Sequence, residues 1–149
     1  MKLSQHFDLS EFTRSESAKR EGLDNTPTSE HLENLKILCE KVLEPIRLRY
    51  GSINISSGYR GKMLNHFIGG SVNSDHCLGR AADIDMDDSG TGVTNKEIFD
   101  YIKDNLEFDQ LINEFNYSWV HVGYRQGANR KQVLKAVKEK GKTVYQVIK

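Results

Sequence analysis

Two histidines and one aspartate are the residues whose types and spacing could hold a catalytic metal ion. His76 and Asp83 lie in the run Ser74-Asp75-His76-Cys77-Leu78-Gly79-Arg80-Ala81-Ala82-Asp83, and His121 follows much later, between Val120 and Val122. Two imidazoles and one carboxylate form a ligand set for a catalytic zinc ion, with the fourth coordination position left open for water. The pattern predicts a hydrolase with one zinc ion, although spacing alone also fits ordinary surface side chains.

The run that carries His76 and Asp83 predicts a loop leading into a strand. The two side chains are seven positions apart in the sequence, which is too wide for one helical turn. Gly79 permits a tight turn, and the small side chains of Ala81 and Ala82 let the strand pack closely beside a metal ion. Asp83 would then supply an oxygen from this strand, and His121 a nitrogen from a neighbouring strand.

Three segments have the periodicity or capping residues of helices. Apolar residues from Leu32 to Ile46 recur at helical spacing, in a helix that we expect to kink or close at Pro45 and to end by Gly51. A short helix is expected over residues 61–68. Thr94-Asn95-Lys96-Glu97 is a capping box for a helix that continues to about Leu106.

Alternating apolar residues predict short strands around the metal motif. They cover residues 53–57, 81–86, 109–114, 119–124 and 143–148. The third and fourth strands are joined by Phe115-Asn116-Tyr117-Ser118, which suits a hairpin. Because helices come first and strands gather around the motif, we expect an α+β fold: a small, mainly antiparallel sheet with helices packed against it.

The end of the chain is basic. From Arg125 to Lys149 there are eight lysines and arginines and one acid, Glu139. We expect a basic helix over residues 129–140, ending at Gly141, followed by the edge strand. The charge indicates either a solvated face or attraction to an anionic surface such as a cell wall. We therefore expect a single domain, residues 1–149, with about 126–149 as a basic extension.

Composition restricts the partners and the location. The 149 residues suffice for one domain with a core, and 21 basic residues balance 21 acidic ones, so net charge does not indicate nucleic acid. The N-terminus has no apolar signal region, and no stretch approaches membrane-spanning length. We expect a monomer without a signal peptide or membrane contact, made in the cytoplasm.

Several segments together resemble the zinc D-alanyl-D-alanine carboxypeptidase family, the cell-wall metallopeptidases that include phage endolysins. They occur in the expected order over about residues 5–125. The most specific is the Ser-x-His-x-x-Gly-x-Ala-x-Asp signature. The others are Phe7-Asp8-Leu9-Ser10-Glu11-Phe12, Gly22-Leu23-Asp24-Asn25, Val42-Leu43-Glu44-Pro45-Ile46-Arg47, Ile55-Ser56-Ser57-Gly58-Tyr59-Arg60, Leu64-Asn65, Ile68-Gly69-Gly70-Ser71 and Trp119-Val120-His121-Val122.

The resemblance implies a hedgehog/DD-peptidase-like fold and assigns roles to matching residues. The family's zinc ligands map onto His76, Asp83 and His121, and its substrate-anchoring arginine maps onto Arg60. A guanidinium suits that role because it can bind a carboxylate through two parallel hydrogen bonds. Ser74 matches a serine that lies near the bound peptide in relatives.

One position departs from the family pattern. Many relatives carry a general-base acid three residues before the last histidine, where this chain has Ser118. If residues 115–118 form a four-residue loop, Glu114 pairs with Trp119 and Ile112 pairs with His121, so Glu114 shares a face with His121. We therefore expect Glu114 to be the base. Asp85 and Asp75 are the alternatives, since another register could turn Glu114 away.

The resemblance implies amide hydrolysis in peptidoglycan stem peptides, of the D-Ala-D-Ala carboxypeptidase or endopeptidase type. A compact enzyme without a signal peptide suits a phage or prophage setting, in which it would act on the cell wall after release. Two alternatives stay open. One is a non-catalytic, zinc-containing cell-wall-binding module of the same fold, which the serine at position 118 leaves open. The other is a nucleic-acid- or surface-binding protein that works through the basic end, whose binding would weaken steeply with salt.

Overall fold

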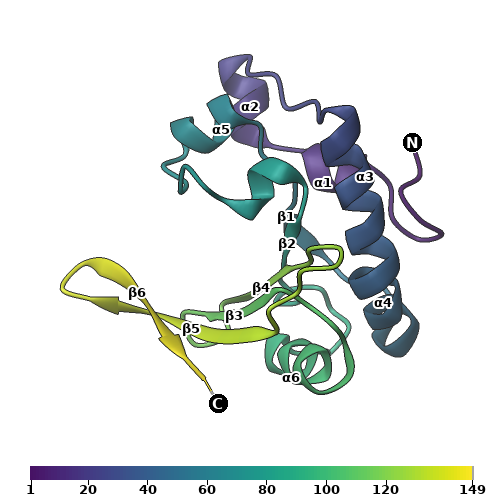
Figure 1. The fold of residues 1–149 in the computed structure, drawn as a ribbon, viewed down its shortest axis with the longest axis vertical. Coiled ribbons are helices and arrows are strands. Elements are labelled where there is room, and N and C mark those ends of the chain that lie inside the picture. The colour runs from purple at the N-terminus through teal and green to yellow at the C-terminus, as the bar shows by residue number, and fades with distance from the viewer. Residues whose placement is uncertain (149) are drawn as a thin grey trace.

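A computed structural model describes residues 1–148 and has an α+β fold, with helices packed on one face of a six-stranded sheet (Figure 1). The helices are α1 (Ser10–Thr13), α2 (Glu16–Glu21), α3 (Ser29–Leu38), α4 (Glu44–Tyr50), α5 (Lys62–Phe67) and α6 (Asn95–Asn105). The strands are β1 (Ile55–Ser57), β2 (Ala81–Ile84), β3 (Gln110–Glu114), β4 (Trp119–Gly123), β5 (Gln132–Glu139) and β6 (Lys142–Val147).

The predicted long helix is present, but its irregular turn precedes Pro45. A π-helical turn, Cys39–Leu43, joins α3 to α4, and the chain stays helical to Tyr50 before Gly51 ends it. Proline has no N–H to donate to the preceding turn, and it is accommodated here in the first turn of α4. None of the helices within residues 1–148 is long and apolar enough to cross a lipid bilayer.

The sheet has the strand order β1-β2-β4-β3-β5-β6. All neighbouring strands run antiparallel except β3 and β5, which are parallel. The mainly antiparallel α+β fold predicted from the sequence is therefore confirmed. The β3–β4 hairpin also has the predicted four-residue loop.

The two faces of the sheet differ because successive side chains of a strand point in opposite directions. One face carries the core, where α3, α4 and α6 pack on Ala82, Ile84, Leu111, Val120 and Val122. The opposite face carries Asp83, Ile112, Glu114 and His121. The apolar half of each central strand thus anchors it to the helices, and the polar half is presented to a cleft.

The basic helix predicted over residues 129–140 is wrong. Residues Gln132–Glu139 form β5, which pairs with β3, and a two-residue turn at Lys140 and Gly141 leads into β6. Both turn residues have positive φ, 50° and 79°, as the type I′ turn of a tight hairpin requires. The predicted edge strand over residues 143–148 is confirmed as β6. In Figure 1 this yellow hairpin extends away from the body of the molecule.

Candidate functional site

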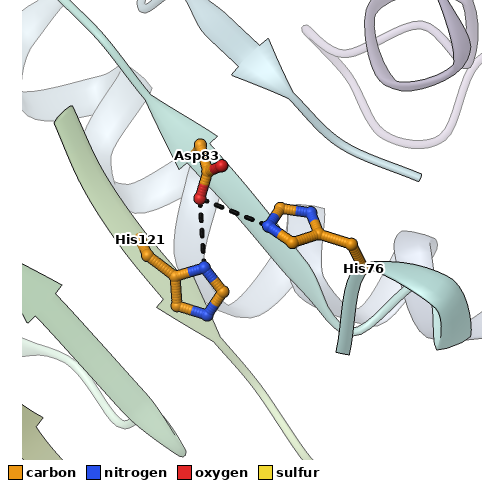
Figure 2. A group of neighbouring side chains, drawn as sticks. All are labelled: His76, Asp83 and His121. Carbon is orange, nitrogen blue, oxygen red and sulfur yellow. Dashed lines mark hydrogen bonds and ion pairs between the residues drawn. The ribbon is translucent and has the colours of Figure 1, made fainter. Parts of the chain in front are cut away.

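The sheet register brings Asp83 and His121 together. Asp83 on β2 is the direct cross-strand partner of His121 on β4, so both side chains leave the sheet on the same face. His121 Nδ1 lies 3.0 Å from Asp83 Oδ1, and His76 Nε2 lies 3.3 Å from the same oxygen (Figure 2). The structure therefore places the three predicted ligand residues in one group, although they are 45 residues apart at most in the sequence.

A hydrogen bond fixes which nitrogen of His76 faces the group. Its Nδ1 donates to the carbonyl oxygen of Gly58 at 2.6 Å, which leaves Nε2 directed at Asp83. His76 lies in a 3₁₀-helix, Asp75–Leu78, and the Ser74 hydroxyl oxygen accepts the backbone N–H of His76 as the N-cap. Histidine ligands in metal sites commonly donate their second nitrogen in this way, which sets the tautomer and the ring orientation.

Gly79 closes the turn that positions His76. It has a φ of +72°, and a Cβ at this position would lie 2.4 Å from the carbonyl oxygen of His31 on α3. A side chain would therefore meet both backbone strain and a collision with helix backbone. The glycine predicted as a turn residue is thus required by the close packing of the turn against α3.

The donor atoms of the group suit a tetrahedral zinc ion. One ligand atom from each of His76, Asp83 and His121 lies within 4.8 Å of the other two. Zinc binds nitrogen and oxygen at about 2.0–2.1 Å, so neighbouring ligands of a tetrahedral ion lie about 3.3 Å apart. The separations of 3.0 and 3.3 Å found here match that value. The three residues fit such an ion and leave one coordination position free.

The charges in the group favour ionised Asp83. Burial raises the pKa of its carboxyl, but the imidazole of His76 and the hydrogen bond from His121 outweigh burial and hold the pKa well below its usual range. Burial lowers the pKa of His121, yet its hydrogen bond and charge interaction with Asp83 raise that pKa overall. Without a metal ion, the Asp83 carboxylate and the imidazoles of His76 and His121 thus interact favourably at the position where a cation would bind.

Glu114 lies beside the group in the predicted register. It pairs with Trp119, and Ile112 pairs with His121, so the sequence-based expectation for the β3–β4 hairpin is confirmed. The Glu114 side chain is buried, and burial raises the pKa of its carboxyl to about 6. A carboxyl group with a pKa near neutrality, close to a candidate metal site, is suited to proton transfer.

The two alternative acids are engaged elsewhere. Asp75 Oδ1 accepts a hydrogen bond from Arg125 at 3.3 Å. Asp85 Oδ1 accepts hydrogen bonds from Asn95 and from the backbone N–H of Asp87. The serine at position 118 is exposed and donates its hydroxyl hydrogen to the carbonyl oxygen of Phe115. It supports the β3–β4 loop, and Glu114 is the carboxylate that the hairpin directs toward the group.

One cleft joins the candidate metal ligands to the other predicted site residues. It has a volume of about 790 Å³ and is lined by Arg60, Ser74, His76, Asp83, Glu114 and His121 among others. Arg60 Nη2 lies 3.4 Å from the Ser74 hydroxyl. Its Nε is buried and makes no hydrogen bond within residues 1–148. The predicted residues are thus brought together, with a guanidinium that retains hydrogen-bonding capacity.

The sequence did not identify a charge network along the same cleft. Asp109 is fully buried and accepts hydrogen bonds from the backbone N–H, Nε and Nη2 of Arg130. Arg125 contacts both Asp109 and Asp75. Burial raises the pKa of Asp109, but these arginines outweigh it and lower the pKa overall. The basic residues after Arg125 were a signal, although they do not reveal a buried acidic partner.

The β5–β6 hairpin also lines the cleft, through Gln132, Leu134, Thr143, Tyr145 and Val147. Predicting β5 as a helix hid this contribution, since a helix there would not continue the face that carries Ile112 and Glu114. The two-residue Lys140-Gly141 turn before an alternating segment was the available signal.

Comparison with known proteins identifies the family. No curated protein matches the chain. A family profile described as Peptidase M15 matches residues 5–123, which include every predicted site residue and end at the last residue of β4. The geometry of the cleft agrees with this match, because M15 peptidases are metal-dependent and the matched segment contains a group that could bind a metal ion. The chain therefore belongs to the Peptidase M15 family.

Proposed function

We propose that the protein is a zinc-dependent peptidase that hydrolyses amide bonds in peptidoglycan stem peptides. The observation that carries the proposal is the single cleft in which His76, Asp83 and His121 form a potential metal site beside Glu114 and Arg60. A three-ligand site with one open position, a buried carboxyl group and an available guanidinium are the groups that peptide hydrolysis needs.

In this proposal His76 Nε2, Asp83 Oδ1 and His121 Nδ1 hold the zinc ion. When bound, zinc polarises a carbonyl group and lowers the pKa of water to about 7. Glu114 accepts the proton of the attacking water and returns it to the leaving amine. Its pKa of about 6 in the metal-free protein supports this role, because a base works best with a pKa near the working pH.

Arg60 binds a carboxylate of the peptide. No carboxylate of residues 1–148 lies within ion-pair distance of Arg60, and its buried Nε has no hydrogen-bond partner among them. A substrate carboxylate would fill both needs through two parallel hydrogen bonds. The Ser74 hydroxyl, 3.4 Å from Arg60 Nη2, completes this end of the cleft.

The test compares Glu114→Gln with the wild-type protein. We expect the variant to keep its zinc and to lose about 10²–10⁴-fold in turnover of a stem peptide, because an amide cannot accept the proton. Glu107→Gln is the matched control, since Glu107 is exposed, and it should leave turnover unchanged. Wild-type protein with stoichiometric zinc that cleaves no peptidoglycan fragment would overturn the proposal.

That result would favour the second candidate, a non-catalytic zinc-containing cell-wall-binding module. The observation on its side is the serine at position 118, which is exposed and hydrogen-bonded to the loop. Two measurements distinguish the candidates. A binding module would bind peptidoglycan fragments without cleaving them, and Glu114→Gln would leave that binding unchanged.

The setting that fits the proposal is lysis of the cell wall by a monomer after release, as in a phage or prophage. The protein cleaves stem peptides in the manner of a D-Ala-D-Ala carboxypeptidase or of an endopeptidase. It has no nucleic-acid or membrane partner. Size-exclusion chromatography with light scattering tests the monomer. Mass spectrometry of the products identifies the bond that is cleaved.

A further inference from the structure

The β5–β6 hairpin lies beyond the segment that defines the family, yet it continues the catalytic sheet. The family match ends at residue 123, while β5 begins at Gln132. β5 pairs with β3 through five successive residues, from Gln110↔Gln132 to Glu114↔Ala136. The hairpin is therefore part of the same rigid sheet as Glu114, and its position relative to the cleft is fixed by backbone hydrogen bonds.

The register extends the cleft face from the candidate metal site onto the hairpin. One row of cross-strand partners runs from His121 through Ile112 and Leu134 to Val147. A parallel row runs from Trp119 through Glu114 and Ala136 to Tyr145. Cross-strand partners share a face, so Tyr145 and Val147 lie on the same surface as Glu114 and His121.

The length of the peptide that this surface could hold follows from the spacing of the strands. β4 and β6 are separated by β3 and β5, so about three spacings of 4.8 Å, or about 14 Å, lie between His121 and Val147. An extended peptide advances about 3.3 Å per residue, so this distance corresponds to about four residues. Arg60 follows β1, on the opposite side of the candidate metal site from β6.

The hairpin presents exposed apolar side chains and a basic turn, a combination that can bind a peptide. Tyr145 and Val147 are 53% and 68% exposed. They pair with Ala136 and Leu134, which form a small buried apolar cluster with Ile112. The turn of the hairpin is cationic, because Lys138, Lys140 and Lys142 surround the single acid Glu139. An apolar surface with a basic rim is complementary to an extended peptide that carries acidic groups.

We propose that the β5–β6 hairpin is a distal substrate-binding surface that takes the acidic, N-terminal part of an extended peptide, about four residues from the scissile bond. The direction rests on the proposed function, because Arg60 binds the carboxylate on the other side of the metal site. The hairpin thereby selects long stem peptides over short ones, and Tyr145 is the central contact on its exposed face.

A purely structural hairpin would not discriminate between substrate lengths. The test therefore measures binding by calorimetry in zinc-loaded Glu114→Gln protein, which avoids turnover. The probes are two N-acetylated stem peptides that end in D-alanine, one of two residues and one of five residues with an acidic residue. We expect the longer peptide to bind at least tenfold more tightly.

Tyr145→Ala in the same background should weaken binding of the five-residue peptide about tenfold and leave the two-residue peptide unchanged. Gln146→Ala is the matched control, because Gln146 is the next residue on β6 but pairs with Lys135 on the other face; it should change neither affinity. Lys140→Glu should weaken only the longer peptide, and less so at high salt.

Equal affinities for the two peptides, absence of binding by both, or an equal effect of Tyr145→Ala on both would overturn the proposal for the hairpin. Failure of the proposed function has a different signature. It would appear as zinc-loaded wild-type protein that cleaves neither peptide, whatever their affinities. Cleavage of both lengths with equal kcat/KM would retain the peptidase and remove the distal surface.

Discussion

Asn95 joins the strand that carries Asp83 to the hairpin that carries Glu114 and His121. It is almost fully buried at the start of α6, beside the capping residue Thr94. Its Oδ1 accepts the backbone N–H of Met86 at 2.7 Å, just after β2. Its Nδ2 lies at hydrogen-bond distance from three oxygens, namely Asp85 Oδ1 and the carbonyls of Tyr117 and Ser118 in the β3–β4 loop.

Asn95→Ala should lower the free energy of unfolding by about 3 kcal/mol. Met86 is buried, so its N–H loses its partner without access to water, which costs about 1–3 kcal/mol. The Tyr117 and Ser118 carbonyls belong to less buried residues and can reach water. Their lost hydrogen bonds therefore contribute only about 1 kcal/mol in total. The sum is a large fraction of the stability of a small domain.

Urea denaturation in the presence of a chelator measures this loss, and Asn105→Ala is the matched control. Asn105 lies at the other end of α6, is exposed, and donates only to the carbonyl of Tyr101. Both changes replace asparagine by alanine in one helix, so the difference in helix propensity largely cancels. The control should change stability by less than about 0.5 kcal/mol.

Zinc affinity is the second readout, because Asn95 fixes the two ligand-bearing strands relative to each other. We expect the dissociation constant for zinc to rise about tenfold in Asn95→Ala and to stay unchanged in Asn105→Ala. A stability loss below about 1 kcal/mol, or equal losses in the two variants, would show that Asn95 does not join the two segments in this way. So would an unchanged zinc affinity in a variant that is destabilised as expected.

Three further predictions concern residues in or around the candidate site. Asp109→Asn should cost about 3 kcal/mol in urea denaturation, since it leaves two arginines without their buried carboxylate; a loss under 1 kcal/mol would contradict this. Gly79→Ala should destabilise clearly more than Gly22→Ala, because both have positive φ but only the first meets a backbone atom, that of His31; equal melting temperatures would be the contrary result. In metal-free protein the pKa of Glu114 is about 6 in the folded state, above its ordinary value of 4.5. The folded state therefore binds more protons than the unfolded state between these two pH values. The free energy of unfolding should fall by about 2 kcal/mol as the pH rises from 4.5 through 6. Glu114→Gln should remove this slope, and identical pH profiles would show the prediction to be wrong.

Part of the geometry around His76 and Glu114 could be predicted because its signals are local. The spacing of His76 and Asp83 on either side of a glycine turn predicted a loop entering a strand, and β2 begins at Ala81. The pairing of Glu114 with Trp119 followed from the expected four-residue loop over 115–118, since a hairpin register follows from its loop. Such features require no knowledge of distant contacts.

β5 could not be predicted in the same way, because its residues favour two structures. Lysine, alanine, leucine and glutamate are good helix formers, and Val133, Leu134 and Val137 recur at helical spacing. Pairing with β3 on one side and β6 on the other decides for the strand. Tertiary hydrogen bonds of this kind override propensity and leave no pattern within β5 itself; the Lys140-Gly141 turn after it was the local signal.

Buried polar networks were missed for a related reason. The capping box identified Thr94 but gave no role to Asn95, whose partners lie up to 23 residues away. Likewise, nothing in the basic composition after Arg125 pairs Arg130 with the buried Asp109, 21 residues earlier. The partners of a polar side chain depend on the sheet register, which must be known before such contacts can be inferred.

The most direct test of the metal-dependent peptidase is mass spectrometry of peptidoglycan fragments incubated with three preparations: zinc-loaded protein, chelator-treated protein, and chelator-treated protein to which zinc has been returned. If His76, Asp83 and His121 hold a catalytic zinc ion, the first and third will release the same peptide product and the second will release none. Absence of product from the zinc-loaded protein, or the same product with zinc removed, would show that the protein is not a metal-dependent peptidase.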